Sequence, residues 1–207
     1  MTAARKIEIV FAHPALEKSR VNRVLLAAAR GVAGVTVHDL YEAYPDMYLD
    51  TAQEQALLIA HDIIVFHHPF YWYSTPAILK EWMDLVLTHG WAYGSTGTAL
   101  RGKQMFNAIT TGGGEAAYCE TGHNRFTVLQ FLAPMDQTAH LCGIEYLPPF
   151  VVHGTHSLDA AQIAAHAADY ARYLTALRDG RVDMDGLRRA ERANENLDAL
   201  LLGEGEH

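Results

Sequence analysis

Cysteine is scarce in this sequence, since Cys119 and Cys142 are the only two among 207 residues. Two cysteines cannot build the disulfide scaffold of a small secreted domain, so a reduced, cytoplasmic setting is expected. The 12 histidines form no HExxH motif and the cysteines no CxxC motif, so no metal site is predicted. No apolar run is long enough to cross a bilayer. No secretory signal is expected either, because the apolar run after Lys6 ends at His13-Pro14.

Basic residues are fewer than acidic ones, with 16 Lys and Arg against 24 Asp and Glu and a net charge of −8. This balance argues against a nucleic-acid partner, which normally contacts a basic face, and against direct binding to anionic lipid. The sequence also lacks GxGxxG, the Walker lysine pattern and GxSxG. Their absence argues against a dinucleotide-binding Rossmann fold, an NTPase and an α/β hydrolase.

Short apolar segments rich in β-branched residues alternate five times with segments of helical periodicity. Strands are expected at residues 7–12, 35–40, 63–66, 104–109 and 144–153, and helices at residues 20–30, 52–60, 77–87, 126–142 and 157–180. Pro148-Pro149 interrupts the fifth strand, whose second half is expected to form the ladder. Right-handed crossovers between such units give a three-layer sandwich around a five-stranded parallel sheet.

Two segments lie outside this alternation. Residues 41–50 are rich in tyrosine and contain Pro45, so an irregular stretch is expected there. The tail after Gly180 contains many charged and amide residues, and its few leucines can form one weak amphipathic helix. That helix can pack on a neighbouring subunit, or the tail can be loosely attached. We therefore expect one domain over residues 1–180 and a tail over residues 181–207.

The stretch around which the chain is organised follows the third strand and contains four consecutive aromatic residues, Phe70, Tyr71, Trp72 and Tyr73. After it begins a helix for which Thr75 is the expected cap and Pro76 the first residue. Ligands of open parallel sheets bind just beyond the carboxyl ends of the strands, so this loop can take a flat apolar ligand. The alternative is an aromatic cluster that only plugs the top of the sheet, because pockets and cores share this composition.

The loop after the first strand leads into a helix that Ser19 can cap. Free amides of a first helical turn and the helix dipole favour an anion, and Ser19, Asn22 and His13 add donors. An ordinary capped helix is the alternative interpretation.

Glycines follow the fourth strand in the sequence Thr110, Thr111, Gly112, Gly113, Gly114. They let the backbone approach a ligand closely and present its amides, although the same glycines suit a flexible loop. Tyr118 and His123 come next, at the same end of the sheet. A phenol and an imidazole near a pocket can donate protons to a substrate oxygen, whereas each alone is equally typical of a surface.

Five stretches in this order together resemble one family. They are residues 11–14 with Ser19 and Asn22, then residues 68–76, 89–94, 110–113 and 147–150, which read FAHP, HPFYWYSTP, HGWAYG, TTGG and LPPF. Over residues 7–178 the chain resembles the flavodoxin-like NAD(P)H:quinone oxidoreductases. Within them it is similar to bacterial members that resemble the ancillary flavoproteins of glutathione-regulated potassium efflux systems. The tail beyond Gly180 has no obvious counterpart in the shorter relatives.

The resemblance implies a flavin, usually FMN in the bacterial branch although FAD is also open, across the ends of the first, third and fourth strands. The implied cofactor-binding residues are His13, Ser19, Arg20, Val21 and Asn22 at the phosphate end, Phe70, Tyr71, Trp72 and Tyr73 along the isoalloxazine, and Thr110, Thr111, Gly112 and Gly113 at its polar edge. Tyr118 and His123 are the implied catalytic residues, with the spacing around His123 differing slightly between branches.

The implied reaction is a hydride transfer from NADH or NADPH through the flavin to a quinone. Donor and acceptor occupy the same place in turn, so ping-pong kinetics are expected. The family's site lies at a two-fold interface, which implies a homodimer to which Trp91 and Tyr93 can contribute.

A different class of function stays open. The protein can be a regulatory ancillary subunit of a membrane potassium/proton antiporter, with the flavin as a structural or sensing ligand. It would then be cytoplasmic and reach the inner membrane through its partner. No antiporter-binding surface is visible in the sequence, so the oxidoreductase is the first prediction and regulation the alternative.

Overall fold

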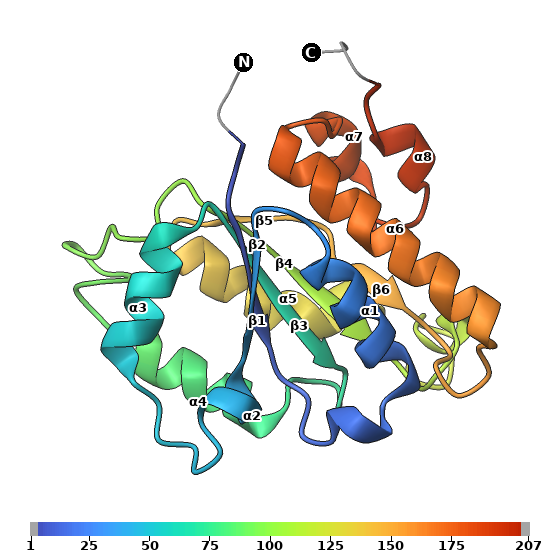
Figure 1. Cartoon of the computed structure of the whole chain (residues 1–207), viewed down its shortest axis with the longest axis horizontal. Coiled ribbons are helices and arrows are strands. Elements are labelled where there is room, and N and C mark those ends of the chain that lie inside the picture. The colour runs from blue at the N-terminus through green and yellow to red at the C-terminus, as the bar shows by residue number, and fades with distance from the viewer. Residues whose placement is uncertain (1–3, 204–207) are drawn as a thin grey trace.

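The computed structural model describes residues 4–203 and contains one parallel sheet between two layers of helices (Figure 1). The strands are β1 Ile7–Phe11, β2 Val35–Asp39, β3 Ile63–Pro69, β4 Gln104–Thr110, β5 Glu145–Tyr146 and β6 Phe150–Val152. Their order is β2-β1-β3-β4-β5, and β6 also pairs with β4. All strand pairs are parallel. This is the strand order of flavodoxin-like doubly wound sheets, so the predicted fold is confirmed.

Helices α1 Arg20–Arg30 and α6 Ala160–Asp179 pack on one face of the sheet. Helices α2 Leu40–Ala43, α3 Thr51–Ala60, α4 Ala77–Val86 and α5 Val128–Leu141 pack on the other face. Alternate residues of β1 serve the two layers, because Ile7 and Ile9 belong to the first core and Val10 to the second. Within residues 4–203, none of the helices combines the length and the apolarity needed to cross a lipid bilayer.

The fifth strand position is filled by two short pieces. Glu145 pairs with Gln104 at the start of β4, and Phe150 pairs with Ala108 further along the same strand. Pro148-Pro149 lies between the pieces, and a proline has no N–H to donate to a ladder. The interruption is where the sequence predicts it.

Four local predictions at the element ends are wrong. β3 continues to Pro69, so the predicted loop begins later. No side chain caps α4, and the Thr75 hydroxyl is buried without a hydrogen-bond partner. The irregular stretch contains α2, which Asp39 caps with its carboxylate. Helix α6 begins after Asp159 rather than at Ser157, because Asp159 forms a complete capping box.

The tail forms two short helices, α7 Met184–Arg189 and α8 Leu197–Leu200, instead of one (Figure 1). Five of its apolar residues are buried in the same core as α1 and α6, namely Val182, Leu187, Ala193, Leu197 and Leu200. An antiparallel bridge between Val182 and Leu201 closes the segment on itself. The described part of the tail is therefore packed on the body of the domain.

A buried carboxylate, Glu54 of α3, is the centre of a polar cluster on the α4 face of the sheet. It accepts hydrogen bonds from His38 Nε2 (2.8 Å), the Tyr44 hydroxyl (2.6 Å) and Trp82 Nε1 (2.7 Å). Burial opposes ionisation of Glu54, but these donors hold its pKa below the usual value. Burial alone would lower the pKa of His38, but the hydrogen bond to Glu54 raises it above the usual value. The two side chains form a buried ion pair when His38 is protonated.

Glu8 of β1 lies near this pair, and neither of its carboxyl oxygens has a hydrogen-bond partner. Burial first, and then the charge of Glu54, raises the pKa of Glu8 from 4.5 to about 8. Glu8 is thus a neutral acid at physiological pH. Because the folded protein binds this proton more tightly than the unfolded chain, the stabilisation is complete below pH 4.5 and is lost as the pH rises through about 8.

We therefore predict that Glu8→Gln flattens the dependence of stability on pH. The free energy of unfolding of the wild type, minus that of the variant, should fall by up to about 1.4 kcal/mol per pH unit between pH 4.5 and 8. Urea unfolding at closely spaced pH values measures this difference, in which titrating groups that do not interact with Glu8 cancel. Glu81→Gln, on the exposed face of α4, is the control for loss of a carboxylate. Parallel curves for wild type and Glu8→Gln would refute the assignment.

Candidate functional site

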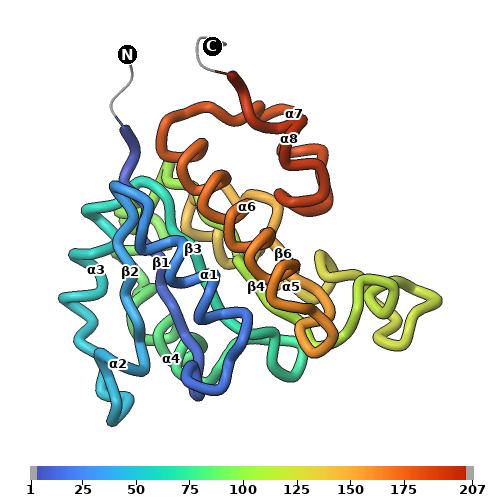
Figure 2. Tube along the Cα trace, turned by 45° about the vertical axis from the view of Figure 1, so that its right-hand side comes forward, coloured from blue at the N-terminus to red at the C-terminus, as the bar shows by residue number. Residues whose placement is uncertain are grey.

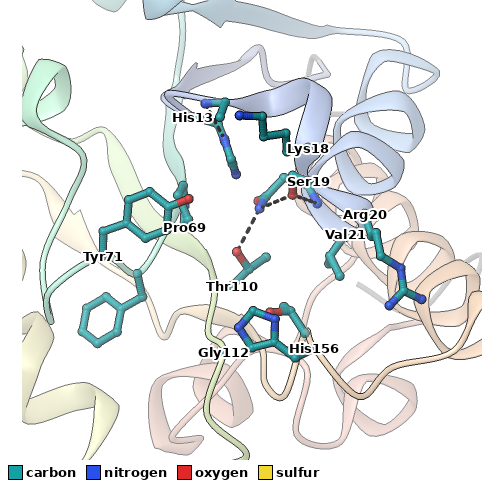
Figure 3. Close-up of a pocket in the computed structure, with 14 residues that line it drawn as sticks. His13, Lys18, Ser19, Arg20, Val21, Pro69, Tyr71, Thr110, Gly112 and His156 are labelled. Carbon is teal, nitrogen blue, oxygen red and sulfur yellow. Dashed lines mark hydrogen bonds between the residues drawn. The ribbon is translucent and has the colours of Figure 1, made fainter.

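A cavity of about 360 Å³ lies beyond the carboxyl ends of β1, β3 and β4 (Figure 3). Its wall comes from the loop and helix after β1, from the end of β3 and the turn after it, from the end of β4 and from the loop before α6. The lining residues are His13, Ala15, Lys18, Ser19, Arg20, Val21, Asn22, Pro69, Phe70, Tyr71, Thr110, Gly112, Thr155 and His156. The cavity is thus at the place where open parallel sheets bind ligands.

The N-terminus of α1 gives one end of this cavity a positive character. Ser19 is the N-cap, and its hydroxyl accepts a hydrogen bond from the Asn22 amide (3.1 Å). The amides of Arg20 and Val21 have no partner within the helix, so they are available to a ligand. Lys18 adds a positive charge at the same end. In a protein of net charge −8, this combination favours an anionic group such as a phosphate.

His13 enters the cavity from the loop after β1, on the same side as Lys18, while His156 lies on the opposite side (Figure 3). The Nδ1 atom of His13 accepts a hydrogen bond from the Ala15 amide (3.1 Å). Burial lowers the pKa of His13, so the neutral ring carries its proton on Nε2. That N–H is a donor for an oxygen inside the cavity.

The side chain of Asn22 joins four elements beneath the cavity floor. Its amide nitrogen donates to the hydroxyls of Ser19 (3.1 Å) and Thr110 (3.0 Å). Its oxygen accepts from Nε2 of His67 on β3 (3.2 Å). The Tyr170 hydroxyl of α6 donates to Nδ1 of the same ring (3.4 Å). Burial lowers the pKa of His67 to about 3, so its imidazole is neutral and links Asn22 on one side to Tyr170 on the other.

A second cavity of about 330 Å³ adjoins the first, and Phe70 lines both. Its lining residues are Phe70, Trp72, Tyr73, Gly113, Ala117, Tyr118, His123 and Asn124. Aromatic rings therefore dominate this space. It suits flat molecules, whereas the first cavity suits an anion.

The aromatic turn has an uncommon backbone. Trp72 and Tyr73 have φ values of 50° and 61°, in the left-handed region that non-glycine residues rarely adopt. The Ser74 amide donates to the Tyr71 carbonyl (3.0 Å) and closes the turn. Such strain costs on the order of 1 to 3 kcal/mol per residue and is typical of binding sites. The turn leaves Trp72 93% exposed, so its ring is free to cover a ligand.

Hydrogen bonds from the β6 side hold the glycine-rich loop after β4. The Thr111 hydroxyl donates to the Gly113 carbonyl (2.8 Å), which leaves its oxygen to accept from His153 Nδ1 (3.0 Å). The Gly154 amide donates to the same Gly113 carbonyl (2.9 Å). At Gly112 a Cβ atom would lie 2.8 Å from Nε2 of the exposed His156 side chain, so any residue other than glycine there would require this imidazole to move.

Tyr118 follows this loop, in the segment between β4 and α5 that projects from the body of the molecule (Figure 2). Its ring packs against His153, with centroids 5.4 Å apart, and near Phe70 at 6.2 Å. Burial raises the pKa of its hydroxyl, so Tyr118 stays protonated and can donate. His123 lines the same cavity but is exposed to solvent.

The structure brings the sequence-predicted site residues together in two neighbouring groups. The first cavity contains His13, Ser19, Arg20, Val21, Asn22, Phe70, Tyr71, Thr110 and Gly112. The second contains Phe70, Trp72, Tyr73, Gly113, Tyr118 and His123. Thr111 lines neither cavity, because its side chain is buried and bonded to the loop backbone. Its place is behind the site.

Sequence reasoning missed five residues of the first cavity, Ala15, Lys18, Pro69, Thr155 and His156. Lys18 is adjacent to the predicted cap, and its charge is a signal that could have found it. Pro69 ends a strand that was predicted too short. Thr155 and His156 come from the connection after β6, and no local motif marks them.

Comparison with known proteins decides the family. A family model for a flavodoxin-like fold matches residues 5–174. The chain belongs to this flavodoxin-like family. Among curated relatives, the glutathione-regulated potassium-efflux system ancillary protein KefG of Shigella flexneri is 43% identical over 174 residues, which cover 84% of this chain and 95% of the relative.

Solved structures agree with this membership of the flavodoxin-like family. General stress protein 14 from Treponema denticola, in complex with FMN, has a TM-score of 0.78 and 39% identity, and the match covers 83% of this chain and 99% of that one. An NADPH-quinone reductase from P. pentosaceus has a TM-score of 0.75 and 32% identity, with 82% and 98% coverage. The tail helices α7 and α8 lie beyond the residues that the family model matches.

We predict that Asn22→Leu destabilises the protein although it preserves side-chain size. The leucine would leave the His67 Nε2 proton and the Thr110 hydroxyl without their partner, and each buried unpaired group costs about 1 to 3 kcal/mol. Urea unfolding at pH 7 measures the loss. The partly exposed Asn124 is the matched control, and its replacement by leucine should cost less than about 0.5 kcal/mol. Equal losses in the two variants would contradict the central role of Asn22.

Proposed function

We propose that this flavodoxin-like protein is an FMN-dependent NAD(P)H:quinone oxidoreductase. The observation that carries the proposal is the pair of adjoining cavities, one lined by an anion-binding helix N-terminus and the other by aromatic rings, at the carboxyl ends of β1, β3 and β4. Relatives that cover most of the chain support it, because one is a complex with FMN and another is an NADPH-quinone reductase.

The residues of the site fit FMN. Its terminal phosphate would be held by the amides of Arg20 and Val21, the Ser19 hydroxyl, Lys18 and the Nε2 proton of His13. Gly112 lines the cavity and has no side chain, so the backbone of the loop after β4 can lie close to the ring edge. FMN is favoured over FAD because the relative from Treponema denticola is a complex with FMN.

When bound, FMN supplies a ring that takes a hydride from NADH or NADPH and gives it to a quinone. The chain positions both substrates by the aromatic walls of the second cavity, Phe70, Trp72 and Tyr73. Conversion of a quinone to a quinol needs one hydride and one proton. The Tyr118 hydroxyl donates a hydrogen bond or that proton at the quinone oxygen and is recharged from solvent, with His123 at the exposed rim as a second donor.

A second role is supported by the curated relatives. Ancillary proteins of glutathione-regulated potassium efflux systems are 43% and 44% identical to this chain. The protein would then be a cytoplasmic partner of a membrane potassium/proton antiporter and reach the inner membrane through it. The two roles are compatible within one molecule.

The first test is the spectrum and kinetics of the purified protein. It should contain or take up FMN, show the flavin absorption bands, and oxidise NADH or NADPH with a soluble quinone in ping-pong fashion. Tyr118→Phe should lower turnover roughly tenfold or more, the usual range for loss of a proton donor, with flavin content unchanged. A protein that binds no flavin would overturn the proposal. Flavin binding without NAD(P)H oxidation would refute the oxidoreductase role and leave the antiporter role as the remaining proposal.

We also propose a homodimer, because exposed aromatic residues surround the second cavity and Trp72 has almost no cover within the chain. Trp91 and Tyr93, which the sequence suggested as contributors, pack partly against the core. Light scattering after size exclusion at micromolar concentration should give twice the 22.9 kDa of the chain. Trp72→Glu should shift the mass towards the monomer without loss of stability, and a wild-type monomer would reject the dimer.

A further inference from the structure

The part of the tail between α7 and α8 runs along the outer edge of β6. The Ala193 amide donates to the Pro149 carbonyl (2.9 Å). The Asn194 side chain binds both backbone groups of Val151, accepting from its N–H (3.0 Å) and donating to its carbonyl (2.8 Å). An amide side chain thus replaces a neighbouring strand. These bonds fix the backbone directly after Arg192.

From this fixed backbone, Arg192 reaches the segment that carries Tyr118. Its guanidinium Nη2 donates to Glu115 Oε1 (2.6 Å), three residues before Tyr118. The Arg192 side chain is 17% exposed, against 66% for Glu115, so the tail supplies the ordered half of the pair. The hydrogen bond from Arg192 lowers the pKa of Glu115, which keeps the carboxylate charged.

Tyr118 lies between the proposed active site and this tail contact. On one side its ring lines the aromatic cavity. On the other side it lines a small cavity of about 60 Å³, whose wall includes Glu115, His153, Glu191 and Arg192. Burial is the main cause that lowers the pKa of His153 to about 4, and the positive charge of Arg192 is the second cause. His153 in turn forms a hydrogen bond with the Thr111 hydroxyl in the glycine-rich loop.

We propose that Arg192 is a positioning residue that holds the Glu115 to Tyr118 segment, and with it the Tyr118 hydroxyl, against the aromatic cavity. Arg192 acts through Glu115 and makes no contact with substrate. It lies outside the family match at residues 5–174. Its effect on catalysis rests on the proposed oxidoreductase function, whereas its effect on the segment does not.

The test is hydrogen exchange of residues 113–124 by mass spectrometry on the full chain with FMN present. In Arg192→Gln these amides should exchange up to about fivefold faster, the range expected for loss of a partly exposed ion pair. Arg192→Lys should stay within about twofold of wild type, because it keeps the charge. In the wild type, 1 M NaCl should speed the exchange towards that of Arg192→Gln.

Arg188→Gln is the matched control, because Arg188 also comes from the tail and pairs with Glu145 (2.8 Å) away from both cavities. It should leave exchange of residues 113–124 unchanged. In steady-state assays Arg192→Gln should lower turnover with quinone severalfold at unchanged flavin content, and Arg188→Gln should not.

Exchange in Arg192→Gln that matches the wild type would overturn the proposal, as would an equal acceleration in Arg188→Gln. Insensitivity of the wild type to salt would also overturn it. A wild type without quinone reductase activity, but with the expected exchange pattern, would refute the proposed function and leave the positioning of the segment by Arg192 in place.

Discussion

The side-chain amide of Asn22 is the interaction on which the site depends. It ties the first turn of α1 to the end of β4 through Thr110 and to β3 through His67, whose Nδ1 atom accepts a hydrogen bond from the Tyr170 hydroxyl of α6. The side chains joined by these hydrogen bonds are neutral. Buried hydrogen bonds therefore set the distance between the anion-binding helix end and the glycine-rich loop.

The aromatic turn differs from this network, because its ordered backbone has a conformation that its own residues disfavour. Two adjacent residues, Trp72 and Tyr73, hold a left-handed backbone that glycine would adopt at lower cost. The Tyr73 ring stacks on Phe131 of α5, with centroids 4.9 Å apart and planes 18° from parallel. This stack fixes one ring of the turn while Trp72 points into solvent, so rigid and free aromatic surface lie side by side at the mouth of the second cavity.

Much of this fold follows from local sequence signals. The Ser19 cap, the β-branched strands and the proline pair at 148 and 149 predicted α1, the parallel sheet and the split fifth strand. The missed features depend on contacts between distant residues. His67 and His68 read as loop residues, yet they are buried at the end of β3 because Asn22 and Asn107 supply partners for neutral imidazoles. Likewise, no pattern near Thr155 or His156 reveals that α6 begins beside the β1 loop, and the buried leucines of the tail are too widely spaced for one amphipathic stripe.

Asn194 has a consequence for how the sheet can meet other chains. A β-sheet normally offers unpaired backbone groups at its last strand, and an extended peptide or a second molecule can dock there. At Val151 both of these groups are already taken by the carboxamide. The margin formed by β6 is thus closed to recruitment of a foreign strand, and any complex that this protein joins on that side must be built from side-chain contacts.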